Sequence, residues 1–188
     1  MRLDAVNDSA NFRRERALTL KGNTMKKLFL IAALLTICNI ATAETITGIV
    51  TRVSDGDTLT VKTDKRKTYT IRLARIDAPE ISHFGNPAQP FGKEAGDWLR
   101  EVARSEPVTV QIDTVDKYGR SVGTVFMGNE NLNAMMVEDG YAWVFDYFAQ
   151  DEQGDELRKL ETVARENHKG LWIDANPINP ADFRKSKK

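Results

Sequence analysis

The feature that most constrains the fold is a series of three short runs, within residues 45–76, in which apolar side chains recur at every second position. The runs cover residues 45–53, 58–63 and 69–76. A period of two places alternate side chains on one face of a β-strand. Because only a few residues separate the runs, we expect three sequential strands in an antiparallel meander.

The rest of the chain alternates between predicted helices and strands. A loop rich in Pro and Gly covers residues 78–90, and a helical spacing of apolar residues follows over 91–102. We expect a strand pair at 108–112 and 122–126, a short helix at 132–137 and a short strand at 142–145. Asn131 is a candidate N-cap for the short helix at 132–137. We expect a final helix at 151–169, whose inward side chains are Leu157, Leu160, Val163 and Ala164. This order predicts the α+β class: a five-stranded Greek-key β-barrel of the OB-fold type with about three helices.

The first 43 residues are set apart from the fold. Met25-Lys26-Lys27, an apolar stretch over 28–37 and Ala41-Thr42-Ala43 have the order of a secretory signal peptide at 25–43. We interpret residues 1–24 as a mis-called N-terminal extension, 44–180 as the OB-fold domain and 181–188 as a basic tail. We therefore expect an exported protein, either periplasmic or secreted, with no membrane anchor after signal cleavage.

Composition narrows the class of partner. Residues 1–43 hold seven of the 27 basic residues, three of the 27 acidic residues and the one cysteine, Cys38. The remaining chain therefore has a net charge of about −4 and no disulfide. A negative chain does not suit a protein that coats nucleic acid without regard to sequence, which is normally basic. The negative net charge does not argue against an enzyme whose positive charge is concentrated in a metal site.

Three carboxylates lie where predicted strands begin or end. Asp55 and Asp57 belong to an Asp-Gly-Asp-Thr turn, and Asp77 lies at the end of the third run. If these strands pair, the carboxylates converge, and oxygen ligands of this kind favour Ca²⁺ or Mg²⁺. The two histidines, His83 and His168, lack the spacing of a zinc site. Taken alone, Asp-Gly-Asp is also an ordinary turn signal.

Two further strings supply the cations and a spare carboxylate. Arg72 lies inside the third run, and Glu80 follows the metal candidate Asp77 by three residues. The Arg72 guanidinium could bind a phosphate, and the Glu80 carboxylate could act as a general base. The alternative is an internal ion pair between Arg72 and Glu80. Lys117, Tyr118 and Arg120 surround Gly119 in a tight turn, where they are either phosphate and base contacts or a solvated hairpin.

In their order and spacing, the strings Asp55–Thr58, Arg72–Glu80 and Asp116–Arg120 resemble those of the staphylococcal nuclease, or thermonuclease, family. The similarity runs from about residue 48 to residue 172, and with the export signal it is typical of an exported bacterial member. It implies an OB-fold and a Ca²⁺-dependent endonuclease that hydrolyses DNA and RNA at the P–O5′ bond, leaving 3′-phosphate ends. We expect a monomer whose partners are these nucleic acids.

The resemblance also implies a role for each residue of the three strings. Ca²⁺ would be held by Asp57, Asp77 and the backbone carbonyl of Ala78, with Asp55 supporting these ligands from outside. Glu80 would be the general base on water, and two arginines would stabilise the transition state: Arg72 and Arg120. Lys117 and Tyr118 would contact a neighbouring phosphate.

The chain departs from the family pattern at two places. The family has Thr at the position of Ala78, and it has two tyrosines where this chain has Asp146 and Phe148, with Tyr147 between them. Base stacking then falls to Tyr147 or Phe148. The rival hypothesis is a non-catalytic exported OB-fold module that binds nucleic acid, and a third is an OB-fold binder of polysaccharide or protein. Neither needs Arg72, Glu80 and Arg120 together.

Overall fold

The structure is a computed structural model that describes residues 44–82 and 87–187. The signal peptide expected at 25–43 and the extension expected at 1–24 lie outside the described residues. Within the described ranges, no helix combines the length and the apolar character that a membrane span needs.

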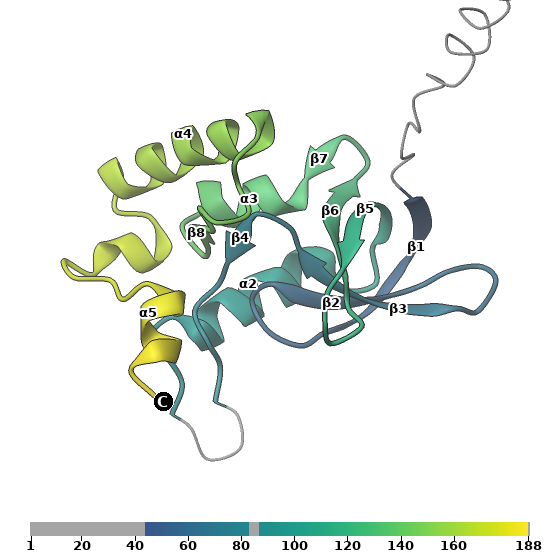
Figure 1. Ribbon diagram of the computed structural model, residues 1–188, viewed down its shortest axis with the longest axis horizontal. Coiled ribbons are helices and arrows are strands. Elements are labelled where there is room, and N and C mark those ends of the chain that lie inside the picture. The colour runs from purple at the N-terminus through teal and green to yellow at the C-terminus, as the bar shows by residue number, and fades with distance from the viewer. Residues whose placement is uncertain (1–43, 83–86, 188) are drawn as a thin grey trace, which may run out of the picture. The chain divides into compact units, whose positions relative to one another are not determined.

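Five strands close into a barrel, which confirms the predicted α+β OB-fold. They are β1 (Glu44–Val53), β2 (Thr58–Lys62), β3 (Thr68–Leu73), β5 (Pro107–Val115) and β6 (Ser121–Met127). Neighbouring strands run antiparallel in the order β3-β2-β1-β5-β6, and β3 then pairs with β6 in parallel. Figure 1 shows these strands on one side, α3 (Leu132–Glu138), α4 (Glu152–Glu166) and α5 (Pro180–Lys185) on the other, and α2 (Gly92–Ala103) between them.

The remaining elements are short. A two-residue strand β7 (Glu130–Asn131) extends the sheet beside β6, and a separate pair joins β4 (Ile76–Asp77) to β8 (Trp143–Val144). A 3₁₀ turn, η1 (Gly170–Ile173), follows α4. The pair β4–β8 matters for the site because it fixes Asp77 opposite Trp143.

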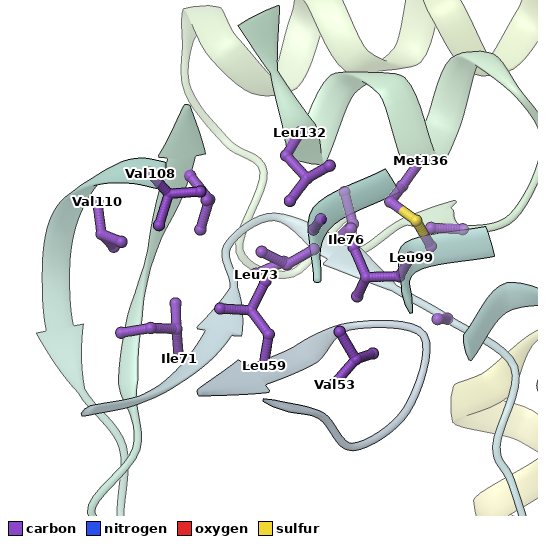
Figure 2. Close-up of a cluster of buried hydrophobic side chains, with 14 of the residues drawn as sticks. Val53, Leu59, Ile71, Leu73, Ile76, Leu99, Val108, Val110, Leu132 and Met136 are labelled. Carbon is purple, nitrogen blue, oxygen red and sulfur yellow. The ribbon is translucent and has the colours of Figure 1, made fainter. Parts of the chain in front are cut away.

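The core fills the barrel with the alternate side chains that the period-two pattern predicted. Leu59, Ile71, Leu73 and Val110 are fully buried. Figure 2 shows such side chains from several strands directed into one interior, with Leu132 and Met136 of α3 nearby. Burial of this apolar surface is the main stabilising contribution, at about 25 cal/mol per Å².

The third predicted strand is shorter than the sequence indicates. We expected one strand over 69–76, whereas β3 ends at Leu73 and the chain turns through Ala74 and Arg75 before β4. Arg75 takes a left-handed conformation with φ of 64°. Its guanidinium is held by Asp113 and Asp151 at 2.7 and 2.6 Å. These ion pairs stabilise a left-handed turn at a position where the sequence has neither Gly nor Asn, the residues that usually adopt this conformation.

The helices follow the predicted capping more closely than the predicted boundaries. The Asn131 side chain accepts a hydrogen bond from the Ala134 amide, which confirms it as the N-cap of α3. The final helix is shorter than expected and ends at Glu166. Val163, expected to point inward, is 48% exposed, so its inward assignment was wrong.

The C-terminal segment is a further correction. We expected a basic tail over residues 181–188, but α5 runs to Lys185. Its start carries the usual signals: the Asn179 side chain accepts from the Ala181 amide at 2.9 Å, and Pro180 occupies the first turn. Lys185 and Arg184 lie in the last turn, where cations are favoured by the helix dipole.

Candidate functional site

Asp57 and Asp77 converge on one guanidinium. Arg72 places Nη1 2.5 Å from Asp57 Oδ2 and Nη2 2.9 Å from Asp77 Oδ1. The side chains of Asp57 and Asp77 are only 8% and 3% exposed, and that of Arg72 is 18% exposed. Three residues that the sequence predicted from two separate strings therefore meet in one largely buried cluster, which we call the carboxylate cluster together with Glu80.

Backbone geometry holds Asp57 at the start of β2. Its carbonyl accepts from the Leu73 amide at 2.8 Å, and its Oδ2 accepts from the Ala78 amide at 3.2 Å. The turn before it requires glycine, because a Cβ on Gly56 would lie 2.7 Å from the Cβ of Ala78 and 2.8 Å from that of Ala95. The close approach of α2 to this turn therefore explains the Asp-Gly-Asp spacing.

Asp55 supports Asp57 rather than joining the ion pairs. Its Oδ1 accepts a hydrogen bond from the Asp57 amide at 3.1 Å. Burial, and next the charge of Asp57, raise the pKa of Asp55 to about 6. Asp55 therefore contacts the carboxylate cluster through Asp57.

Glu80 lies beside Asp77, and both contact an arginine that the sequence reasoning missed. Arg184 of α5 donates from Nη2 to Asp77 Oδ2 at 2.7 Å, and from Nη1 to Asp77 Oδ1 at 3.1 Å. The same Nη1 lies 2.6 Å from Glu80 Oε1. No local pattern places Arg184 there, since it is more than a hundred residues away in sequence. The capping signals at Asn179 and Pro180 were the available clue to its helix.

The cluster holds both arginines firmly in the charged form. Burial lowers the pKa of Arg72, but the charges of Asp57 and Asp77 outweigh it and raise that pKa above its ordinary value. Burial likewise lowers the pKa of Arg184, but hydrogen bonds to Asp77 and then Glu80 outweigh it and raise that pKa above its ordinary value. The internal Arg72–Glu80 pair left open by the sequence is not what forms, because Glu80 pairs with Arg184.

Arg120 directly precedes β6, and β6 closes the barrel by pairing with β3, which contains Arg72. In the parallel β3–β6 pairing, Arg72 lies opposite Val122, two residues after Arg120. Residues two apart in extended chain share a face, so an extended continuation of β6 would place Arg120 on the same face as Val122 and Arg72. The Arg120 guanidinium donates to Asp116 Oδ2 at 2.7 Å, which holds it at the base of the turn.

The turn before Arg120 projects an exposed aromatic ring. Gly119 has φ of 79°, which a tight turn here requires, and Tyr118 is 73% exposed. Lys117 Nζ lies 5.0 Å from the centroid of the Tyr118 ring, and Arg120 Cζ lies 5.6 Å from it. The ring and both cations thus form one small surface.

Tyr147 and Phe148 lie in the segment after β8. Both are exposed, and their rings pack edge to face with centroids 4.7 Å apart. In the part of the chain that the structure describes, no hydrogen bond or ring contact joins either residue to the carboxylate cluster. They form a separate aromatic surface.

The carboxylate cluster suits a hard cation by its donor chemistry. Asp57 and Asp77 offer oxygens only. Together with Glu80 they pair with two arginines, and Asp55 adds a fourth acidic group that contacts Asp57. Buried carboxylates in excess of cations favour an added positive charge. Across residues 44–82 and 87–187, however, no three His, Cys, Asp or Glu side chains gather as a ready-made metal site. Two carboxylates, completed by a backbone carbonyl and water, would have to suffice.

The barrel and the cluster of buried carboxylates with two arginines define the protein as a small OB-fold protein with one charged candidate site. The model of the staphylococcal nuclease homologue family matches residues 70–174. The chain belongs to that family.

Curated relatives support this membership. The probable endonuclease LCL3 of Candida dubliniensis is 37% identical over 167 residues, covering 73% of this chain and 71% of the relative. An uncharacterized endonuclease of Escherichia coli O157:H7 is 38% identical over 143 residues, covering 76% of this chain and 87% of the relative.

Proposed function

We propose that the protein is a Ca²⁺-dependent endonuclease that hydrolyses DNA and RNA at the P–O5′ bond and leaves 3′-phosphate ends. The observation that carries the proposal is the carboxylate cluster, where Arg72 joins Asp57 and Asp77 while Glu80 lies beside them. The relatives named as endonucleases support the hydrolase class. The substrate, the metal and the bond cleaved rest on the family resemblance and this chemistry.

Each charged group has a distinct task in phosphodiester hydrolysis. Glu80 would take a proton from the attacking water, since a carboxylate beside the reaction centre serves as a general base. Arg72 and Arg120 would donate hydrogen bonds to phosphoryl oxygens as negative charge grows on them. Arg72 in β3 and Arg120 directly before β6 would both bind oxygens of one phosphate.

Asp57, Asp77 and the carbonyl of Ala78 would hold Ca²⁺, with Asp55 behind them. Bound there, the cation would supply Lewis-acid polarisation of a phosphoryl oxygen. The Ala78 amide already contacts Asp57 Oδ2, so its backbone is tied to the cluster. Because a main-chain ligand does not depend on the side chain, Ala in place of Thr is compatible with this assignment.

Substrate contacts away from the scissile phosphate would come from two surfaces. Lys117 and Tyr118 would bind a neighbouring phosphate, and Tyr147 or Phe148 would stack a base. Exposed aromatic rings beside cations are a common means of holding single strands. The expected export signal would carry the enzyme to the periplasm or beyond the cell.

The test is cleavage of single-stranded DNA by the purified protein, with Ca²⁺ and with EGTA, beside Glu80→Gln. We expect rapid cleavage that needs Ca²⁺ and is largely lost in the variant. Glu101→Gln makes the same chemical change at an exposed position of α2 and should cleave like the parent protein. End-group analysis of the products should find 3′-phosphates.

The rival function, a non-catalytic nucleic-acid-binding module, predicts a different result. It predicts binding of single strands without cleavage at any Ca²⁺ concentration. If the folded protein binds DNA but does not cleave it, the enzyme hypothesis is wrong and the non-catalytic binding module is favoured.

A further inference from the structure

The C-terminal segment is attached to the loop that carries Glu80. Gln89 is buried, and its Nε2 donates to the Ile178 carbonyl at 2.6 Å. Its Oε1 accepts from the Glu80 amide at 3.2 Å, and its own amide donates to the Glu80 carbonyl at 2.9 Å. One buried amide side chain therefore links the backbone of the candidate base to the segment that leads into α5.

That attachment continues into α5 and to Arg184. Ile178 is followed by the cap residue Asn179 and by Pro180, which is buried. The helix then brings the Arg184 guanidinium onto both oxygens of Asp77 and onto Glu80. Three charge-assisted hydrogen bonds from one side chain make this a specific contact rather than a loose surface pair.

The contact occupies the groups that the proposed reaction needs. Asp77 Oδ2 receives Arg184 Nη2 at 2.7 Å, and Asp77 Oδ1 is shared between Arg72 and Arg184. Glu80 Oε1 is engaged as well, at 2.6 Å. A divalent cation on Asp77 and a free Glu80 both require Arg184 to withdraw, because like charges repel and the same lone pairs cannot serve both.

We propose that Arg184 is a built-in competitor of the divalent cation, which neutralises Asp77 and Glu80 until the cation displaces it and so sets the cation affinity of the site. This inference rests on the metal site of the proposed function. The Arg184 side chain is 40% exposed, so it has solvent to move into, whereas Asp77 is 3% exposed and stays in place. Arg72 lies deeper and keeps its bonds to Asp57 and Asp77, so it plays a different part.

The test measures Ca²⁺ binding directly, without nucleic acid, by titration calorimetry on the purified protein and on Arg184→Gln. We expect about tenfold tighter binding or more in the variant, since the cation no longer has to displace a guanidinium. We also expect the variant to melt at a lower temperature than the parent in EGTA, because Asp77 and Glu80 lose a partner. Saturating Ca²⁺ should remove most of that difference.

A matched control lies on the same helix. Lys185→Gln also removes one positive charge, but Lys185 pairs with Asp182 at 2.9 Å and not with the cluster. Its Ca²⁺ affinity should stay within about twofold of the parent, since exposed charges contribute little. Arg184→Lys keeps the charge but loses the forked geometry, and its affinity should fall between those of the parent and Arg184→Gln.

The outcomes separate this inference from the function. Equal or weaker Ca²⁺ binding in Arg184→Gln overturns the competitor role and leaves the nuclease proposal standing. No Ca²⁺ binding by the parent or either Arg184 variant overturns both the metal site and the competitor. Tighter binding in the variant without DNA cleavage by the parent supports the competitor and overturns the nuclease.

Discussion

Arg72→Met tests whether the carboxylate cluster is held together by a buried guanidinium. The substitution keeps an unbranched side chain of similar reach and removes both ion pairs, at 2.5 Å to Asp57 and 2.9 Å to Asp77. Among the described residues, the Thr58 hydroxyl and the Ala78 amide would still donate hydrogen bonds to Asp57. Asp77 would keep Arg184.

The expected loss follows from burial. Removing one partner of a buried ion pair costs about 3–5 kcal/mol, because a charge is left in the interior without compensation. The 18% exposure of Arg72, together with the partner left to Asp77, places this site at the lower end, at about 3 kcal/mol. With a urea m-value of about 2 kcal/mol/M, the unfolding midpoint should fall by roughly 1.5 M.

The assay is urea unfolding followed by circular dichroism in EGTA, with Arg52→Met as the control. Arg52 is exposed on β1, so the same change there should alter the free energy of unfolding by no more than about 0.5 kcal/mol. A loss below about 1 kcal/mol in Arg72→Met would refute the reasoning, since it would mean that water already compensates Asp57 and Asp77. Added Ca²⁺ should restore part of the loss if the proposed cation site is correct.

Three other changes probe the activity, the core and the pH response. Arg120→Ala should lower the rate of DNA cleavage by about 10²–10³-fold while circular dichroism stays unchanged, and a loss below fivefold would remove it from the catalytic group. Asn133→Leu should cost about 2–3 kcal/mol in urea unfolding, because the Val125 amide and the Ala74 carbonyl lose their buried partner; an unchanged midpoint would contradict this. Asp151→Asn keeps a good N-cap for α4 but loses the charge that faces Arg75, whose hydrogen bond lowers the pKa of Asp151. Because the folded-state pKa of Asp151 lies below its unfolded value, the ionised side chain stabilises the fold above about pH 4, and this contribution is lost as the pH falls through the folded-state pKa. The melting temperatures of parent and variant should therefore differ at pH 7, and the difference should shrink progressively as the pH falls below about 4.

The barrel was predictable because its signals are local. Period two marks β1, β2 and β3, and each predicted run overlaps its strand. The convergence of Asp57 and Asp77 also follows, since both lie at strand ends that a meander brings together. The early end of β3 does not follow, because Arg75 takes a left-handed turn only through ion pairs with Asp113 and Asp151 from distant elements.

The position of Arg184 is a second feature that could not be predicted from the sequence. A helix of six residues is too short for a hydrophobic period, and its cationic end is typical of a solvated tail. The Asn179–Pro180 start could have predicted the helix itself. Its docking depends on Gln89 and on the carboxylates of Asp77 and Glu80, which are far away in sequence, and no spacing along the chain encodes those contacts.

The parallel pairing of β3 with β6 has a consequence for how long the site keeps its shape. Arg72 belongs to β3, and Arg120 directly precedes β6. The Ala74 amide also donates to the Gly123 carbonyl at 2.8 Å, which continues the pairing of the two strands. Arg72 and Ser121, the residue that follows Arg120, are therefore both held by main-chain pairing, which limits how far the two arginine backbones can separate. A fluctuation that parts β3 from β6 would separate the two arginines, so slow exchange of the amides between these strands with deuterated water would measure the lifetime of the proposed phosphate-binding geometry.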